Sequence, residues 1–304
     1  MSDLERAFAA LNGKLATYTE LFAYAEGTQP QKYSTQALRE AFRNIQTHFS
    51  QNWCSVVLDA ALDRITLKGW DVDQKDLQDT LEAVWNANTL GLEAEQVHKA
   101  TLITHEGFII AWPGADGKPE CFYNQPQLCH VFYAADNPRK KDFAAKWYED
   151  KGANVWHLTL YYPDRLEYYV TRETDSQPTA YTAFEPDKKQ FADGKAPNEY
   201  GAIPVFHFQV DRCSNQGELG NILTLQDAVN KLLADMMIVA EYGAFPQRWV
   251  ISNASTANLK NAPNLILDLA ASDGQSQPTS VGQFPAADLN VYLNAIDKLA
   301  NSIA

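Results

Sequence analysis

The sequence contains none of the short motifs that identify the common nucleotide-binding and hydrolytic sites. There is no GxxxxGKS/T phosphate loop, no GxGxxG after a predicted strand, no HExxH and no GxSxG. No uncharged apolar run approaches the ~18 residues that a membrane-spanning helix needs. No basic segment followed by an apolar one opens the chain, so the sequence gives no indication of secretion. These absences argue against a membrane protein and leave no visible reaction centre.

Cysteine is also scarce. The four cysteines lie at positions 54, 121, 129 and 213 and form no CxxC pair, so we expect reduced thiols of a cytosolic protein. Cys121, Cys129 and His130 could contribute to a metal site, but their spacing fits no common zinc motif. We therefore expect these residues to have core or surface roles, with no metal and no cofactor.

Basic residues are too few for a protein that clamps duplex DNA. The 304 residues include 38 acidic and 25 basic side chains, a net charge of −13, whereas tight DNA binding requires lysine and arginine to displace phosphate counterions. The densest basic run, "RKK" at 139–141, is expected to be the solvated start of a helix. Such a chain could lie beside DNA without holding it.

A long amphipathic helix is the clearest pattern. In "LQDAVNKLLADMMIVAEYGAFPQRW" (225–249), apolar residues recur at spacings of four and three, which is typical of a helix packed lengthwise on a neighbour. These residues are Leu225, Val229, Leu232, Met236, Val239 and Gly243. The opposite face carries Asp227, Asn230, Lys231, Asp235 and Glu241. We expect a supporting helix that lies between an apolar partner and water and ends at Pro246.

The rest of the chain predicts an α+β fold. Helical patterns cover 3–25, with Gly27 as the stop, and then 37–49, 54–65, 76–86 and 92–104. Residues 107–210 are rich in β-branched and aromatic residues, and alternation on both sides of Pro163-Asp164 predicts a hairpin over 155–173. Further strands are expected at 203–210 and 247–252, and His157 and His207 are expected at ordinary sheet positions.

A second long helix is predicted from Asp288 to the C-terminus. Asp288 is the expected N-cap. The expected apolar face consists of Leu289, Leu293, Ile296, Leu299 and Ala300. Two long helices thus flank a small, loop-rich insert.

Two other functions stay open on these patterns. Asp59 and Asp63 lie four residues apart beside Arg64, a spacing that a metal-dependent hydrolase with paired carboxylates could use. A solvated helix face with a local Asp–Arg contact is the simpler interpretation. The chain could also be a cytoplasmic helical adaptor for some other partner.

Five stretches, taken in order, resemble phage portal proteins of long-tailed double-stranded DNA phages and their prophages. They are "YTELFAYAEGTQPQKYS" (18–34), "NWCSVVLDAALDRITLKGW" (52–70), "LYYPDRLEYY" (160–169), "NEYGAIPVFHF" (198–208) and "LQDAVNKLLADMMIVAEYGAFPQRWVIS" (225–252). The last two carry the most specific likeness. Together the stretches extend over nearly the whole chain.

This resemblance implies a portal-protein fold with an α/β wing, a two-helix stem and a small clip insert. The wing would cover 1–217, helical over 1–106 and β-rich over 107–217. The first stem helix would be 218–245, the clip 246–286 and the second stem helix 287–304. Chains of the family continue into a tunnel loop and a crown, and we expect these parts to be missing here.

The same resemblance implies a structural role without enzymatic activity. About twelve subunits would form a ring-shaped DNA channel at a capsid vertex, used in genome packaging, ejection and head–tail joining. Asp227, Lys231, Asp235 and Glu241 are the candidates for the channel lining, although a solvated outer face explains them nearly as well. Gln247 and Arg248 are the candidates for partner contacts at the clip.

The implied partners are other copies of the chain, the terminase motor, a head–tail adaptor, and capsid and scaffolding proteins. Double-stranded DNA would pass through without sequence-specific binding, and no membrane would be involved. The expected location is the portal vertex of the virion, after assembly in the host cytoplasm.

Overall fold

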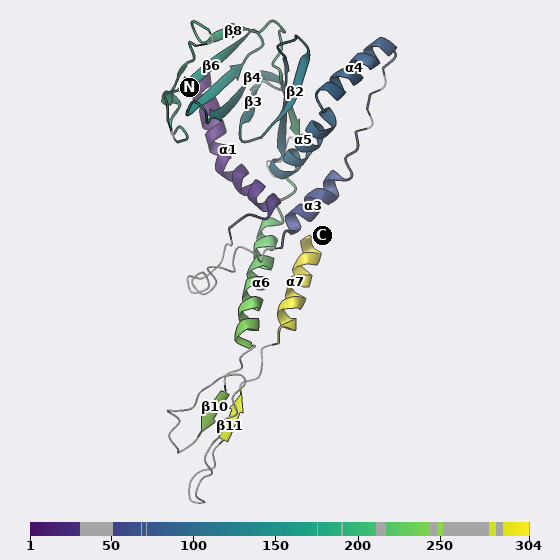
Figure 1. Cartoon of the computed structure of the whole chain (residues 1–304), viewed down its shortest axis with the longest axis vertical. Helices are drawn as coiled ribbons and strands as arrows, with labels where there is room; N and C mark the ends of the chain where they lie inside the picture. The colour runs from purple at the N-terminus through teal and green to yellow at the C-terminus, as the bar shows by residue number, and fades with distance from the viewer. Residues whose placement is uncertain are drawn as a thin grey trace, which may run out of the picture. The chain divides into compact units, whose positions relative to one another are not determined.

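The structure is a computed structural model that describes residues 1–30, 51–67, 69–70, 72–174, 176–189, 191–210, 217–243, 248–251, 280–283 and 288–303. The chain divides into two compact units (Figure 1). The N-terminal unit comprises Met1–Gln29 and Asn52–Leu223, and the C-terminal unit comprises Pro30–Gln51 and Thr224–Ala304.

The N-terminal unit opens with the long helix α1 (Asp3–Glu26). Ser2 caps its start, because the Ser2 Oγ accepts the N–H of Glu5 at 3.2 Å. Gly27 ends the helix in the left-handed conformation, at a φ of 73°, which glycine adopts without a Cβ clash. The predicted helix at 3–25 and its glycine stop are confirmed.

Three more helices follow in this unit: α3 (Trp53–Leu62), α4 (Lys75–Ala87) and α5 (Leu90–Thr104). Asn52 caps α3 by accepting the N–H of Ser55 at 3.1 Å. The predicted helices at 54–65, 76–86 and 92–104 are confirmed, with boundaries that differ by up to three residues. The predicted helix at 37–49 lies outside the described residues.

The larger sheet has six strands in the order β3-β4-β5-β6-β7, with β8 also paired to β6. Its strands are β3 (Cys129–Ala134), β4 (Asn137–Asp150), β5 (Val155–Tyr161), β6 (Arg165–Thr171), β7 (Phe184–Pro186) and β8 (Lys195–Pro197). The short 3-10 helix η1 (Tyr181–Ala183) precedes β7. Strands β5 and β6 form the predicted hairpin over 155–173.

The basic run at 139–141 was predicted wrongly. It lies in β4, whose partner across the hairpin is β3, and does not begin a helix. The rest of β4 explains the difference, because it is buried on both faces: Phe143, Ala145 and Trp147 pack under α1, and Ala144 packs in the layer between the two sheets. Arg139 and Lys140 lie in the exposed start of that strand, and Lys141 is half-buried.

The smaller sheet has three strands in the order β2-β1-β9. Its strands are β1 (Glu106–Pro113), β2 (Pro119–Asn124) and β9 (Val205–Gln209). All the strand pairs of both sheets are antiparallel in the described part of the chain. The α+β prediction is confirmed at this level, and His157 and His207 lie in strands as expected.

Two apolar layers hold the unit together. One lies between α1 and the larger sheet, where Phe8 meets Trp147 edge to face with ring centroids 5.9 Å apart. The other joins the two sheets through Phe108 and Ile110 of β1 and Val131 of β3. Helix α5 packs on the smaller sheet (Figure 1).

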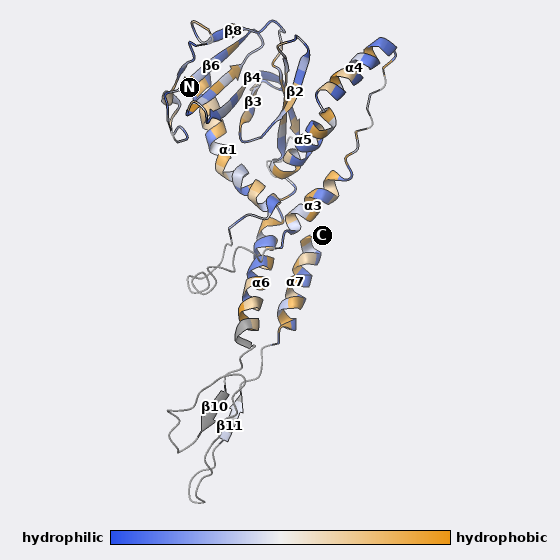
Figure 2. Ribbon diagram, in the orientation of Figure 1, coloured by the Kyte–Doolittle hydropathy of each residue, from blue (hydrophilic) through white to orange (hydrophobic). Residues whose placement is uncertain are grey.

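The described part of the C-terminal unit contains α6 (Leu223–Gly243), β10 (Arg248–Ile251), β11 (Ser280–Gln283) and α7 (Asn290–Ile303). Strands β10 and β11 pair antiparallel, with Arg248 opposite Gln283. Apolar and polar residues alternate along both helices (Figure 2). The predicted strand at 247–252 is confirmed, whereas β11 falls in a segment expected to be loop.

We expect Trp147→Ala to lower the free energy of unfolding of the N-terminal unit by about 3–5 kcal/mol, because it opens a cavity beneath α1. Trp147 is 0% exposed and also donates from Nε1 to the carbonyl of Gln127 at 3.0 Å. Tyr148→Ala is the matched control: the next residue points to the other face, is 40% exposed, and should cost about 1 kcal/mol or less. Urea unfolding followed by near-ultraviolet circular dichroism measures both, and equal losses would contradict this packing.

Candidate functional site

The first turns of α6 carry two buried amides beside the buried Val229. Gln226 is 0% exposed and donates from Nε2 to the carbonyl of Gln51 at 2.7 Å. Asn230, one turn further on, is 4% exposed and accepts the N–H of Gln51 at 3.2 Å. Together the two side chains bind both main-chain groups of one residue. They thereby fix the segment before α3 to the first turns of α6.

Only part of the predicted apolar face of α6 is buried in the structure. Val229 is 0% exposed, but Leu225, Leu232, Met236 and Val239 are half-buried. From 231 to 240 every residue of α6 is half-buried, whatever its polarity. In the single chain, therefore, the two faces of the helix differ in chemistry more than in exposure.

The predicted channel-lining residues fall into three situations. Asp227 is 7% exposed, so its carboxylate does not belong to the open surface of the chain. Lys231 and Asp235, one turn apart, form an ion pair in which each side chain is 29% exposed. Glu241 lies in the last turn of α6, and its side chain is outside the described part of the structure.

The predicted clip residues can be placed only in part. Gln247 lies outside the described residues, and Arg248 begins β10.

The start of α7 follows the prediction closely, because Asp288 Oδ1 accepts the N–H of Asn290 at 2.9 Å. On the predicted apolar face of α7, Ile296 and Ala300 are buried, whereas Leu293 is 46% exposed.

The paired carboxylates considered for a hydrolase do not form a site. Asp59 and Asp63 are both exposed at the end of α3. Among the described residues, no group of three or more histidine, cysteine or acidic side chains is arranged to hold a metal ion. Cys129 and His130 are neighbours in β3, whereas Cys121 lies in β2.

A buried ionic cluster, which the sequence did not predict, surrounds Glu106 at the start of β1. Glu106 Oε1 accepts from Lys14 Nζ at 2.7 Å and from the hydroxyl of Tyr18 at 2.9 Å. Its Oε2 lies 3.2 Å from His207 Nε2, and His207 Nδ1 lies 3.0 Å from the Tyr133 hydroxyl. The side chains of Glu106 and His207 are 4% and 3% exposed. Oε1 thus accepts two hydrogen bonds, Oε2 lies beside the His207 ring, and both side chains are shielded from water.

The titration of this cluster follows from its burial and pairing. Burial alone would raise the pKa of Glu106, but the contact with His207 and the charge of Lys14 outweigh it and lower the pKa to about 2. Burial lowers the pKa of Lys14 against the opposing charge of Glu106. Burial also raises the pKa of Tyr18 and lowers that of His130, the latter to about 4. The cluster is therefore an ionic joint between α1, β1 and β9.

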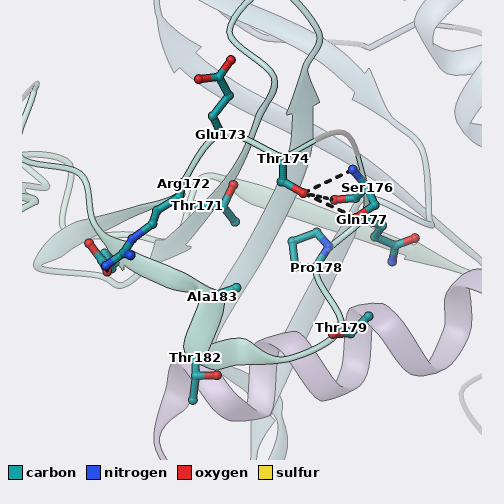
Figure 3. A pocket seen from close by; sticks show the side chains of 11 residues that line it. Thr171, Arg172, Glu173, Thr174, Ser176, Gln177, Pro178, Thr179, Thr182 and Ala183 are labelled. Carbon is teal, nitrogen blue, oxygen red and sulfur yellow. Dashed lines mark hydrogen bonds and ion pairs between the residues drawn. The ribbon is translucent and has the colours of Figure 1, made fainter.

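A shallow pocket of about 440 Å³ opens after β6 (Figure 3). Hydroxyl and amide side chains line most of it, and Arg172 and Glu185 close one side as an ion pair at 3.0 Å. Thr174 bonds to Ser176 within the same loop. The lining contains no histidine and no cysteine. The described lining residues offer hydrogen bonds, and none of them forms a nucleophile–base pair.

A comparison with protein-family models gave a match that covers most of the chain. A family model described as "Phage portal protein, SPP1 Gp6-like" matches residues 65–304. The match includes both sheets and the helices α6 and α7. A comparison with curated proteins gave no match. Within the described ranges, no helix combines the length and the apolar character needed to cross a bilayer.

We expect Glu106→Gln to be less stable than the parent chain by about 3 kcal/mol at pH 7, because Lys14 loses its buried partner. The folded pKa of about 2 lies below the ordinary 4.5. The stabilisation from the charged carboxylate is therefore present above pH 4.5 and is lost as the pH falls from there toward 2.

Urea unfolding at several pH values measures this contribution, and the parent chain should show the steeper loss in that acidic window. Glu185→Gln, which removes an exposed carboxylate from a surface pair, should change the profile little. Superimposable profiles for the parent and Glu106→Gln would show that the buried pair does not stabilise the fold.

Proposed function

The chain belongs to the phage portal protein family, and from this premise we propose that α6 and α7 are the two stem helices of a portal channel. The observation that carries the proposal is the match over 65–304. The order of the elements within that match supports it, because two long helices flank the strand pair β10–β11.

The membership itself establishes the general role. The chain is a structural phage portal subunit, and its family serves the capsid in DNA packaging. Portal proteins form an oligomeric ring at a capsid vertex and act with the capsid and the terminase. The match lends no support to the hydrolase or to the cytoplasmic adaptor.

The finer division of the chain is part of the proposal. Residues 1–217 would form the wing, 218–245 the first stem helix, 246–286 the clip and 287–304 the second stem helix. Helix α6 begins at Leu223, so the regular part of the first stem helix is shorter than expected. Helix α7 begins within three residues of its expected start.

The proposed channel wall consists of Lys231, Asp235 and Glu241. Asp227 suits this role less well, because its carboxylate would have to be uncovered before it could meet DNA. The Lys231–Asp235 pair cancels its own charge. A duplex passing such a wall would meet no row of unpaired cations, so it would release few counterions and would not be held.

The remaining partners follow from the same proposal. We expect a ring of about twelve copies, the terminase motor and a head–tail adaptor at the clip, and capsid and scaffolding proteins around the wing. Gln247 and Arg248 are the candidate partner contacts at the clip. Double-stranded DNA would pass without sequence-specific binding. The ring would assemble in the host cytoplasm and remain at the portal vertex of the virion.

Native mass spectrometry of the purified chain tests the ring. We expect one dominant species with the mass of about twelve copies, and negative-stain images should show a central hole. A population that stays monomeric at every accessible concentration, or that stops at twofold dimers, would contradict the channel.

Reversing charge on the proposed wall tests the lining. We expect Asp235→Lys combined with Glu241→Lys to slow DNA packaging several-fold in a reconstituted reaction with terminase, because unpaired lysines would bind passing phosphates. Asp79→Lys combined with Glu82→Lys on α4 makes the same change in charge on exposed residues of the N-terminal unit and should leave the rate unchanged. Equal rates for the two double variants, in rings of normal mass, would exclude the assigned wall.

A further inference from the structure

The edge strands of the two sheets differ in whether their outward main-chain groups are covered. A strand at the edge of a sheet presents unpaired N–H and C=O groups, which proteins normally block or use for binding. In the N-terminal unit, the described residues form four such edges, at β2, β3, β7 together with β8, and β9.

The edge at β2 is closed by helix side chains. The outward carbonyl of Pro119 accepts from Asn88 Nδ2 at 2.9 Å, and the outward N–H of Cys121 donates to Asn88 Oδ1 at 2.8 Å. The N–H of Tyr123 donates to the carboxylate of Glu93. Side chains just after α4 and at the start of α5 thus replace a neighbouring strand.

The edge at β7 and β8 is closed by local bonds and by proline. Pro186 and Pro197 occupy outward positions and have no N–H to offer. The outward N–H of Lys195 donates to Asp193 Oδ1 at 3.1 Å, and that of Phe184 donates to a carbonyl of η1. A further strand would find no free donor here among the described residues.

The edge at β3 is buried. Cys129 is 0% exposed, Val131 is 3% exposed, and the carbonyl of Cys129 accepts from Lys14 of α1. Register shifts at Phe132 and Tyr133 also interrupt the regular geometry of this strand.

The edge at β9 is open in the described structure. Val210 donates its N–H to His105, and Ala111 donates to the carbonyl of Pro204, so even-numbered residues of β9 bond to β1. The odd-numbered residues His207 and Gln209 therefore direct their N–H and C=O groups outward, and no described residue bonds to these groups. The His207 side chain is 3% exposed although the residue is half-buried, so its exposed surface is main chain.

Exposed apolar side chains line the same edge. Phe206 is 51% exposed, Phe208 is 36% exposed and Val210 is 47% exposed. They alternate with the outward-facing main-chain positions and therefore lie on one face of the sheet. Lys141 lies at the N-terminal end of β9. Its Nζ bonds to the carbonyl of Val205 and lies 5.2 Å from the centre of the Phe206 ring.

We propose that the open edge of β9 binds an extended segment of a different protein, which adds as a fourth strand to the β2-β1-β9 sheet. Alternate residues of that segment are apolar and rest beside Phe206, Phe208 and Val210. A carboxylate of the segment lies next to Lys141. Main-chain hydrogen bonds to His207 and Gln209 supply the affinity, and the side chains supply the selection.

A second copy of this chain fits the edge less well. The other three described edges of the N-terminal unit are closed, so no described strand of that unit is free to pair head to tail with β9. Pairing of β9 with β9 would make a closed twofold dimer, which does not propagate around a ring. The proposal does not depend on the channel, because it concerns only the N-terminal unit.

The matched variants Gln209→Pro and Gln209→Ala test it. Both remove the same exposed side chain, but only proline removes the outward N–H, and neither breaks a bond of β9 to β1. The probe is a fluorescein-labelled eight-residue peptide of alternating valine and threonine with one glutamate in place of a threonine. We expect the parent chain and Gln209→Ala to bind within about twofold of one another and Gln209→Pro to bind at least about tenfold more weakly.

A second peptide with lysine in place of the glutamate should bind several-fold more weakly than the first. Hydrogen exchange of the parent chain needs no variant: the amides of His207 and Gln209 should exchange faster than those of Phe206 and Phe208, and should slow on saturation with the first peptide.

Three outcomes overturn the proposal. One is the absence of binding by the parent chain at about 1 mM peptide. Another is equal binding by Gln209→Pro and Gln209→Ala. The third is loss of the ring in Gln209→Pro alone, which would assign the edge to a second copy. A normal ring that binds no peptide would refute this inference and leave the channel intact.

Discussion

The carboxylate of Glu106 is the group on which the geometry of the N-terminal unit depends. A buried charge is costly unless it is paired, and Glu106 bonds to Lys14 and Tyr18 of α1 and lies 3.2 Å from His207 of β9. Three elements that are far apart in sequence must therefore converge on one residue. Together with the apolar layer under α1 and the β1-β9 ladder, that convergence fixes α1 over the larger sheet and β9 beside β1. Thr104 supports it by donating its hydroxyl to the carbonyl of Glu106 at 2.8 Å.

Convergence on Glu106 also decides which edges of the sheets are left open. Lys14, held by the carboxylate, reaches the carbonyl of Cys129 and covers β3. His207 lies beside the other oxygen of the carboxylate. Its ring stacks on that of Phe108, with the ring centroids 4.8 Å apart. Its main chain is then left at the surface of β9. The same ionic joint thus closes one edge and holds another in an open, regular conformation.

The sequence predicted an element well where residues next to it in the chain determine its turn or its end. The Pro163-Asp164 turn gave the hairpin of β5 and β6, Gly27 gave the end of α1, and Asp288 gave the start of α7. Contacts across long separations left no such signal: nothing near Lys14 or Glu106 indicates that they pair across 92 residues. The prediction that the basic run at 139–141 starts a helix was wrong, because charged residues begin exposed strands as readily as they begin helices. Gln226 and Asn230 were overlooked because a helical wheel cannot show that a main chain will arrive to bind them.

Helix α6 shows why an amphipathic pattern does not by itself identify a buried face. Its buried residues gather in the first turns, around Gln51, and the stretch from 231 to 240 is half-buried on every side. A helix that packs in a single chain would bury its apolar residues and expose its polar ones. Uniform half-burial instead leaves Leu232, Met236 and Val239 with surface still to cover. In the proposed ring, copies of the chain would lie on two sides of α6, would cover these residues and would decide which polar residues face the proposed channel. The proposed assembly would therefore account for a repeat that burial within the subunit alone does not explain.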